Sequence, residues 1–147
     1  MTTVVEKSIV VKATPDEVDA VTLDGNLLPQ WYAGVQSVEL EGAYPDPGGA
    51  VKMVYRSAGI NFKMSMTSLR LVKGESLLLK LDGMITGKSR WFYTPEGDDT
   101  RVSCRFEYEM PGGSIGQAVN KLVVERMNVQ NLEKSLEDLK ALVESRK

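Results

Sequence analysis

Large apolar and aromatic side chains recur at every second position in four segments of this 147-residue chain. This spacing predicts β-strands with those side chains on one face, because successive residues of a strand point to opposite sides of the sheet. Methionine and aromatic side chains adapt to irregular apolar molecules, and tyrosine hydroxyls can orient a polar group or move a proton. The set comprises Met53 and Tyr55; Phe62, Met64 and Met66; Trp91 and Tyr93; and Phe106 and Tyr108.

Two interpretations of this shared face stay open. The first is a pocket for a hydrophobic or aromatic small molecule, and the second is an ordinary filled core, the usual meaning of an apolar stripe. On the first interpretation, one cavity should collect six of these side chains, namely Tyr55, Phe62, Met64, Trp91, Tyr93 and Phe106.

Residue types that are missing limit the chemistry further. The chain has no histidine and a single cysteine, Cys104. A Ser-His-Asp triad, a Cys-His pair, a zinc site of the usual His/Cys type and an internal disulfide are therefore impossible within it. Any acid-base catalysis would fall to carboxylates, tyrosines, lysines or water. We expect neither a bound metal nor a cofactor.

The elements that position these residues begin with a β-branched, alternating strand at residues 4–11. Thr14 and Glu17 then have the spacing of a capping box at the start of a short helix. Asn26 is a candidate cap for a second short helix that includes Trp31.

Period-two patterns separated by turn residues predict six further strands. Because the connections have hairpin length, the strands should form an antiparallel meander. The alternation slips near Thr67 and Ser68, which indicates a β-bulge. The alternating segments cover residues 38–40, 51–55, 60–71, 77–81, 91–93 and 102–108.

A long amphipathic helix is predicted from about residue 115 to 145. Ile115, Leu122, Val129, Leu136 and Val143 recur every seven residues, so one stripe is apolar. The segment from Ser114 onward would be roughly 50 Å long as a helix. Such a helix should lie across the sheet, with Leu122 among the residues that face a ligand.

Arg126 interrupts this stripe within about 40° of Leu122, at about 100° per residue. A charge on an apolar face should be paired, reach solvent or contact a ligand. Arg126 is therefore either an anchor for an anionic or strongly accepting ligand group, or a structural residue that reaches solvent or an ion pair.

The order of elements resembles the START-like superfamily, also called SRPBCC proteins. Three segments carry the resemblance: "VVKATPDEV" at 10–18, "LPQWYAGVQSVEL" at 28–40 and "LEKSLEDLKALVE" at 132–144. The chain is most similar to the polyketide cyclase/dehydrase group. The resemblance implies one domain over residues 1–147 with an α+β helix-grip fold. In that fold a seven-stranded antiparallel sheet curves around the C-terminal helix, and two short helices follow the first strand. It also implies a cavity for a hydrophobic ligand. Trp31 is a further candidate ligand-binding residue.

Eighteen basic and twenty acidic side chains give a formal net charge of −2. This balance suits a cytoplasmic protein and gives no electrostatic bias toward nucleic acid. No apolar run approaches the length of a transmembrane helix, so we expect no integral membrane association. We expect a monomer or a homodimer. The leading function is non-catalytic binding or transport of a lipid, quinone or polyketide-like molecule. The alternatives are a cyclase, dehydratase or aromatase that uses tyrosines, Arg126 or water, and a protein-interaction or regulatory module.

Overall fold

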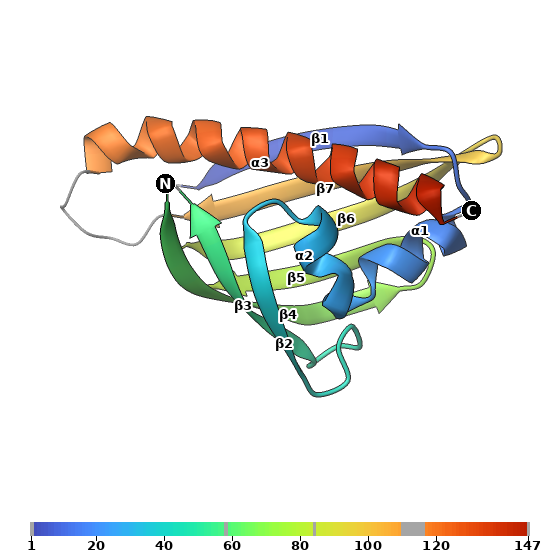
Figure 1. Ribbon diagram of the computed structural model, residues 1–147, viewed down its shortest axis with the longest axis horizontal. Coiled ribbons are helices and arrows are strands. Elements are labelled where there is room, and N and C mark those ends of the chain that lie inside the picture. The colour runs from blue at the N-terminus through green and yellow to red at the C-terminus, as the bar shows by residue number, and fades with distance from the viewer. Residues whose placement is uncertain (1, 58, 84, 110–116, 147) are drawn as a thin grey trace.

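Seven antiparallel strands form one curved sheet, and the long helix α3 (Gln117–Ser145) lies across it (Figure 1). The computed structural model describes residues 2–57, 59–83, 85–109 and 117–146, with the side chains of α3 described from Glu125 onward. The strand order is β1-β7-β6-β5-β4-β3-β2, so the meander is completed by pairing of the first strand with the last. The predicted helix-grip architecture is confirmed.

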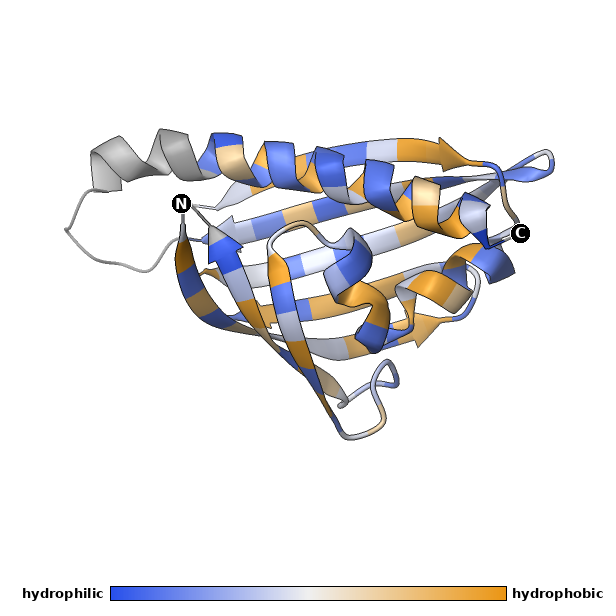
Figure 2. Cartoon of the chain, in the orientation of Figure 1, coloured by the Kyte–Doolittle hydropathy of each residue, from blue (hydrophilic) through white to orange (hydrophobic). Residues whose placement is uncertain are grey.

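Each strand follows one of the alternating sequence patterns, and Figure 2 shows hydrophilic and hydrophobic residues taking turns along the strands. Side chains on one face pack under the helices, while those on the other face are mostly polar. The bounds are β1 (Thr3–Val11), β2 (Val35–Glu41), β3 (Ala50–Ser57), β4 (Ile60–Val72), β5 (Ser76–Asp82), β6 (Thr86–Glu96) and β7 (Asp99–Glu109).

Side-chain caps begin the first short helix and the turn that follows it. The Thr14 hydroxyl accepts a hydrogen bond from the Glu17 N–H at 3.2 Å, and the Glu17 carboxylate accepts one from the Thr14 N–H at 3.0 Å. This capping box starts α1 (Pro15–Thr22), as predicted. The predicted Asn26 cap is wrong, because the Asp24 carboxylate caps the next turn by accepting the Asn26 N–H at 3.0 Å. That 3-10 turn, η1 (Gly25–Leu27), leads directly into α2 (Leu28–Trp31).

The predicted bulge lies one residue beyond the expected position. The β4–β5 register shifts between Ser68 and Arg70, which leaves Leu69 unpaired and 40% exposed. An extra residue reverses the alternation, so Ser68 is buried on one side of the bulge and Leu71 packs against the core on the other. The bulge thus keeps core-facing side chains on both halves of this long strand.

Helix α3 is held by an apolar seam and by polar contacts. Leu132, Leu136, Leu139 and Val143 are buried in the core. Beside them the Ser135 hydroxyl accepts a hydrogen bond from the Ala33 N–H at 2.8 Å and donates one to the Asn131 carbonyl at 2.7 Å. These contacts fix α3 against the connection between α2 and β2.

One buried carboxylate joins α1 to the turn between β4 and β5. Asp19 is 7% exposed, and one of its oxygens accepts a short hydrogen bond from the Gly74 N–H while the other has no hydrogen-bond partner among the described residues. Burial raises the pKa of the Asp19 carboxyl, and nearby Asp16 adds to the rise. The Gly74 N–H and Lys73 offset part of it.

Replacing Asp19 by asparagine should therefore increase the free energy of unfolding at neutral pH. Since the folded-state pKa lies above the unfolded value, Asp19 favours the fold most under acidic conditions, where both states are protonated. Stability should fall as the pH rises through the folded-state pKa, and Asp19→Asn should remove this dependence. Urea unfolding across the acid-to-neutral range measures both, with Asp98→Asn, at an exposed turn position between β6 and β7, as the control. A less stable Asn variant at neutral pH would refute the assignment.

Candidate ligand-binding site

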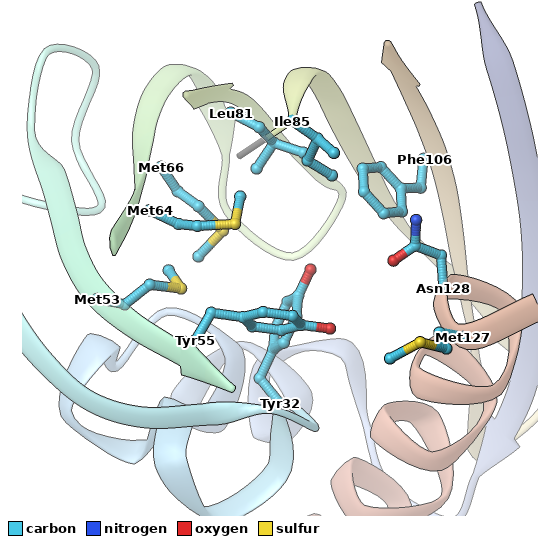
Figure 3. Close-up of a pocket in the computed structure, with 10 residues that line it drawn as sticks. All are labelled: Tyr32, Met53, Tyr55, Met64, Met66, Leu81, Ile85, Phe106, Met127 and Asn128. Atoms are coloured by element: carbon cyan, nitrogen blue, oxygen red, sulfur yellow. The ribbon is translucent and has the colours of Figure 1, made fainter. Parts of the chain in front are cut away.

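A pocket lies between the inner face of the sheet and α3 (Figure 3). We call it the outer cavity. Its volume, counted as the space open to the centre of a water molecule, is about 50 Å³. That is room for a few water molecules and not for a drug-sized ligand. Its walls are formed by Tyr32, Met53, Tyr55, Met64, Met66, Leu81, Ile85, Phe106, Met127 and Asn128.

Every described residue that lines the outer cavity is uncharged. An ionised ligand group would therefore lose its hydration shell without gaining a countercharge, which is strongly unfavourable. An uncharged molecule loses mainly apolar hydration, which favours binding, and its few polar groups can be satisfied by the tyrosine and asparagine side chains. The composition of the walls thus discriminates against carboxylates, phosphates and ammonium groups.

Four methionines give the cavity adjustable walls. Met53, Met64 and Met66 come from the paired strands β3 and β4, while Met127 comes from α3 (Figure 3). Methionine is unbranched and polarizable, so it fills irregular gaps and changes rotamer at little cost. A ligand larger than the present volume can be admitted by moving these side chains.

Two tyrosines bring hydroxyl groups to the cavity. The Tyr55 oxygen accepts a hydrogen bond from the Asn131 amide, so its own proton is left for another acceptor. Burial raises the pKa of Tyr55, and the Asn131 hydrogen bond lowers it in part. Burial also raises the pKa of Tyr32, with neighbouring Cys104 and Tyr55 adding to the rise. Both tyrosines are therefore protonated at neutral pH and act as hydrogen-bond donors rather than as bases.

The position of the Tyr55 ring depends on Gly34. Gly34 has φ +94°, and a Cβ atom built there would lie 2.5 Å from a ring carbon of Tyr55. Glycine adopts this backbone conformation without strain and leaves the space that the ring occupies. Gly34, in the connection between α2 and β2, thus lies directly against the Tyr55 ring, while Asn131 of α3 donates a hydrogen bond to the Tyr55 hydroxyl.

A third polar group comes from α3. The Asn128 side chain lines the outer cavity, and its Nδ2 is buried without a hydrogen-bond partner among the described residues. Asn128 lies close enough to the Tyr108 hydroxyl to influence its pKa, but no hydrogen bond of good geometry joins them. A buried donor without a partner is unfavourable, so an acceptor that came within hydrogen-bond distance of Nδ2 would stabilise it.

The inward orientation of the predicted strand residues is confirmed. Trp91 is 3% exposed and Phe106 is 9% exposed, so neither lies on the solvent face. A register error of one residue would have placed both outside. Trp91 pairs with Cys104 across β6 and β7, and both belong to the buried core.

The predicted single cavity is instead two neighbouring ones. Met53, Tyr55, Met64, Met66 and Phe106 line the outer cavity. A second cavity, which we call the inner cavity, is lined by Trp31, Trp91 and Tyr93. The two cavities are separate because Tyr32 and Met66 occupy the space between them. Phe62 lies opposite Tyr55 in the β3–β4 ladder, and the ring centroid of Tyr108 is 4.9 Å from that of Phe106. Neither Phe62 nor Tyr108 lines the outer or the inner cavity.

Arg126 is exposed on α3, beside Glu125 and Gln130, and it does not line either cavity. The buried seam is centred on Leu132 and Leu139, and Arg126 lies about 120° around the helix from Leu132. The stripe inferred from the sequence passes through Leu122, whose side chain is outside the described part of the structure.

Replacing Arg126 by methionine should leave ligand affinity unchanged within about twofold. The substitution keeps the side-chain length and the helix propensity while removing a charge that is outside the cavity. Titrating matched uncharged and anionic apolar ligands against both proteins checks this. A selective loss of the anionic ligand would show that Arg126 reaches the bound molecule.

Five lining residues were not predicted from the sequence: Tyr32, Leu81, Ile85, Met127 and Asn128. Leu81 shares the alternation of Leu77 and Leu79, so its orientation was readable. Met127 and Asn128 lie on the flank of the apolar stripe of α3, and only the crossing of α3 over the sheet brings them to the cavity. Tyr32 lies at the end of α2, where no periodicity defines a face.

The family model described as polyketide cyclase / dehydrase and lipid transport matches residues 2–144. The chain belongs to this family. A search among curated proteins found no match. Membership in the polyketide cyclase / dehydrase family agrees with the resemblance inferred from the sequence.

Solved structures share the fold of this family member. An aromatase/cyclase from Streptomyces sp. R1128 superposes with a TM-score of 0.87 at 14% identity, over 99% of this chain and 96% of that one. A protein from Thermus thermophilus gives 0.84 at 19% identity, over 99% of both chains. A START superfamily protein from Mycobacterium smegmatis gives 0.76 at 20% identity, over 98% and 99%.

The described part of this family member contains no helix with the length and apolar character needed to cross a lipid bilayer.

Proposed function

We propose that this protein binds an uncharged hydrophobic or aromatic small molecule in the outer cavity and carries it without chemical change. The observation that supports this most is the wall itself, which combines four methionines with hydroxyl and amide groups and has no charge among its described residues. Lipid-like alcohols, quinones and polyketide-like molecules have this character. The family description, which includes lipid transport, fits the same class.

An enzyme of the cyclase or aromatase type is the second candidate function. The family description and the likeness to an aromatase/cyclase favour it, as do the donors on Tyr32, Tyr55 and Asn128, which could polarise a ligand carbonyl. Against it, the described lining holds no carboxylate, and burial keeps both tyrosines protonated. Such a reaction would have to use water as its base.

Native mass spectrometry of the protein purified from its own organism tests the proposal. We expect a co-purifying small molecule that is uncharged once released, and that is recovered unchanged after incubation with fresh protein. An ionised ligand would contradict the proposal. Conversion of the recovered molecule into a cyclised or dehydrated product would favour the enzyme.

A cytoplasmic location, a monomeric or homodimeric state, a single domain and the absence of nucleic-acid partners remain predictions of this proposal. A regulatory role through protein contacts is the remaining alternative. It would be favoured if no apolar molecule entered the outer cavity.

A further inference from the structure

The inner cavity lies behind the outer one and has a volume, counted in the same way, of about 10 Å³. This is at the limit for a single water molecule. Tyr32 and Met66 line both cavities, so these two side chains form the partition between them. The walls of the inner cavity include Leu28, Leu77, Trp31, Trp91 and Tyr93.

The partition can move without breaking a hydrogen bond. The Tyr32 side chain makes no hydrogen bond with the described residues. Its ring is tilted against the rings of Trp31 and Trp91, with centroid separations of 5.5 Å and 6.4 Å. The Tyr32 backbone is fixed, because its N–H donates to the Leu28 carbonyl at 2.8 Å. Met66 has three rotatable side-chain bonds. The ring and the thioether can therefore turn while the backbone stays in place.

Trp31, which lines the inner cavity, carries an unused donor. Trp31 is 3% exposed, and its Nε1–H is buried without a hydrogen-bond partner among the described residues. The nearby Tyr93 hydroxyl is already satisfied, since it donates to the Thr22 hydroxyl at 2.8 Å. Buried indole N–H groups usually have a partner, so an acceptor that reached Trp31 would remove an unfavourable arrangement.

We propose that the two cavities are halves of one site, that Tyr32 and Met66 turn aside to admit an elongated uncharged ligand, and that Trp31 Nε1–H binds its leading acceptor. This proposal rests on the proposed function and narrows the ligand class. The ligand is a long apolar molecule with a carbonyl or hydroxyl at one end. The acceptor end enters the inner cavity, and the apolar remainder lies among the methionines of the outer cavity.

Both tryptophans of the chain, Trp31 and Trp91, line the inner cavity and neither lines the outer one. Quenching of tryptophan emission by a brominated ligand therefore reports entry into the inner cavity. The probes are two isomers of a long-chain methyl ketone, one with bromine close to the carbonyl and one with bromine at the opposite chain end. Displacement of N-phenyl-1-naphthylamine, an uncharged fluorophore, measures binding of either isomer independently of where its bromine lies.

Both isomers should displace the fluorophore equally, and the isomer brominated near the carbonyl should quench tryptophan more strongly. With unbrominated ketones, affinity should rise about fourfold for each added methylene. Tyr32→Ala should lower the ligand concentration that gives half-maximal quenching, the quenching midpoint, about tenfold. The reason is that the ligand no longer has to select the minor state in which the Tyr32 ring is turned aside. Tyr32→Phe removes the hydroxyl but keeps the ring that divides the cavities, so it should not lower the quenching midpoint as Tyr32→Ala does.

The outcomes separate this inference from the proposed function. Displacement without quenching by either isomer would place the ligand in the outer cavity alone and overturn the inference while the proposed function stands. Equal quenching by both isomers would overturn the role of Trp31. A Tyr32→Ala protein that melts normally but keeps the original midpoint would overturn the partition. If no ketone displaced the fluorophore, the proposed function itself would fail.

Discussion

Replacing Leu139 by alanine is expected to lower the free energy of unfolding by about 2–5 kcal/mol. Leu139 is fully buried in the seam between α3 and the sheet. Its truncation leaves a cavity that the surrounding strands cannot collapse to fill, because the sheet is a continuous hydrogen-bonded structure. Urea unfolding with the slope held constant measures the loss.

Leu142→Ala is the matched control for this prediction. Leu142 is the same residue type on the same helix, but it is only partly buried and packs at the margin of the core. Its truncation should have a clearly smaller effect. Equal losses for the two variants would mean that α3 is not held against the sheet along the face described here.

Replacing Met64 by lysine should reverse the charge preference of the outer cavity. Met64 lines the cavity and is half-buried, so the lysine stem can follow the apolar wall while its ammonium group reaches water in the unliganded protein. A charge-assisted hydrogen bond to a bound carboxylate contributes about 1.5–3 kcal/mol, or about one to two decades of affinity. A fatty acid should therefore gain affinity, and the fatty alcohol of the same length should lose it.

Lys63→Met serves as the control, because Lys63 precedes Met64 on β4 and is exposed on the opposite face of the sheet. It changes the net charge without touching the cavity, so both ligands should bind as before. Isothermal titration of both ligands against the three proteins gives the comparison. If Lys63→Met changed selectivity by a similar amount in the opposite direction, the effect would come from the overall field and not from the cavity.

The fold was predictable because its signals are local. The capping box of Thr14 and Glu17, the period-two runs and the heptad repeat each depend on neighbouring residues, and each pattern admits one kind of element. Asp24 was missed as a cap because both it and Asn26 are good capping residues. The bulge was placed one residue early because alternation alone does not show which residue is left unpaired.

The site was predictable only in part, because it depends on how α3 crosses the sheet. Alternation correctly placed Met53, Met64 and Phe106 inside. The rotation of α3 about its axis could not be derived from a stripe that spans Val129, Leu132 and Leu136. The sequence therefore named Arg126 as a candidate and did not name Asn128. The division into two cavities depends on the rotamers of Tyr32 and Met66, which no sequence pattern encodes.

The most direct test is the nuclear magnetic resonance spectrum of methionine methyl groups during titration with a fatty alcohol and with its matched fatty acid. Met53, Met64, Met66 and Met127 line the outer cavity, so their methyl signals report on its occupant. We predict that all four signals shift with the alcohol, and that the ionised acid needs at least about tenfold higher concentration for the same shifts. Binding of the alcohol without shifts at these four methyl groups, or equal shifts with the acid, would contradict an uncharged ligand site between the sheet and α3.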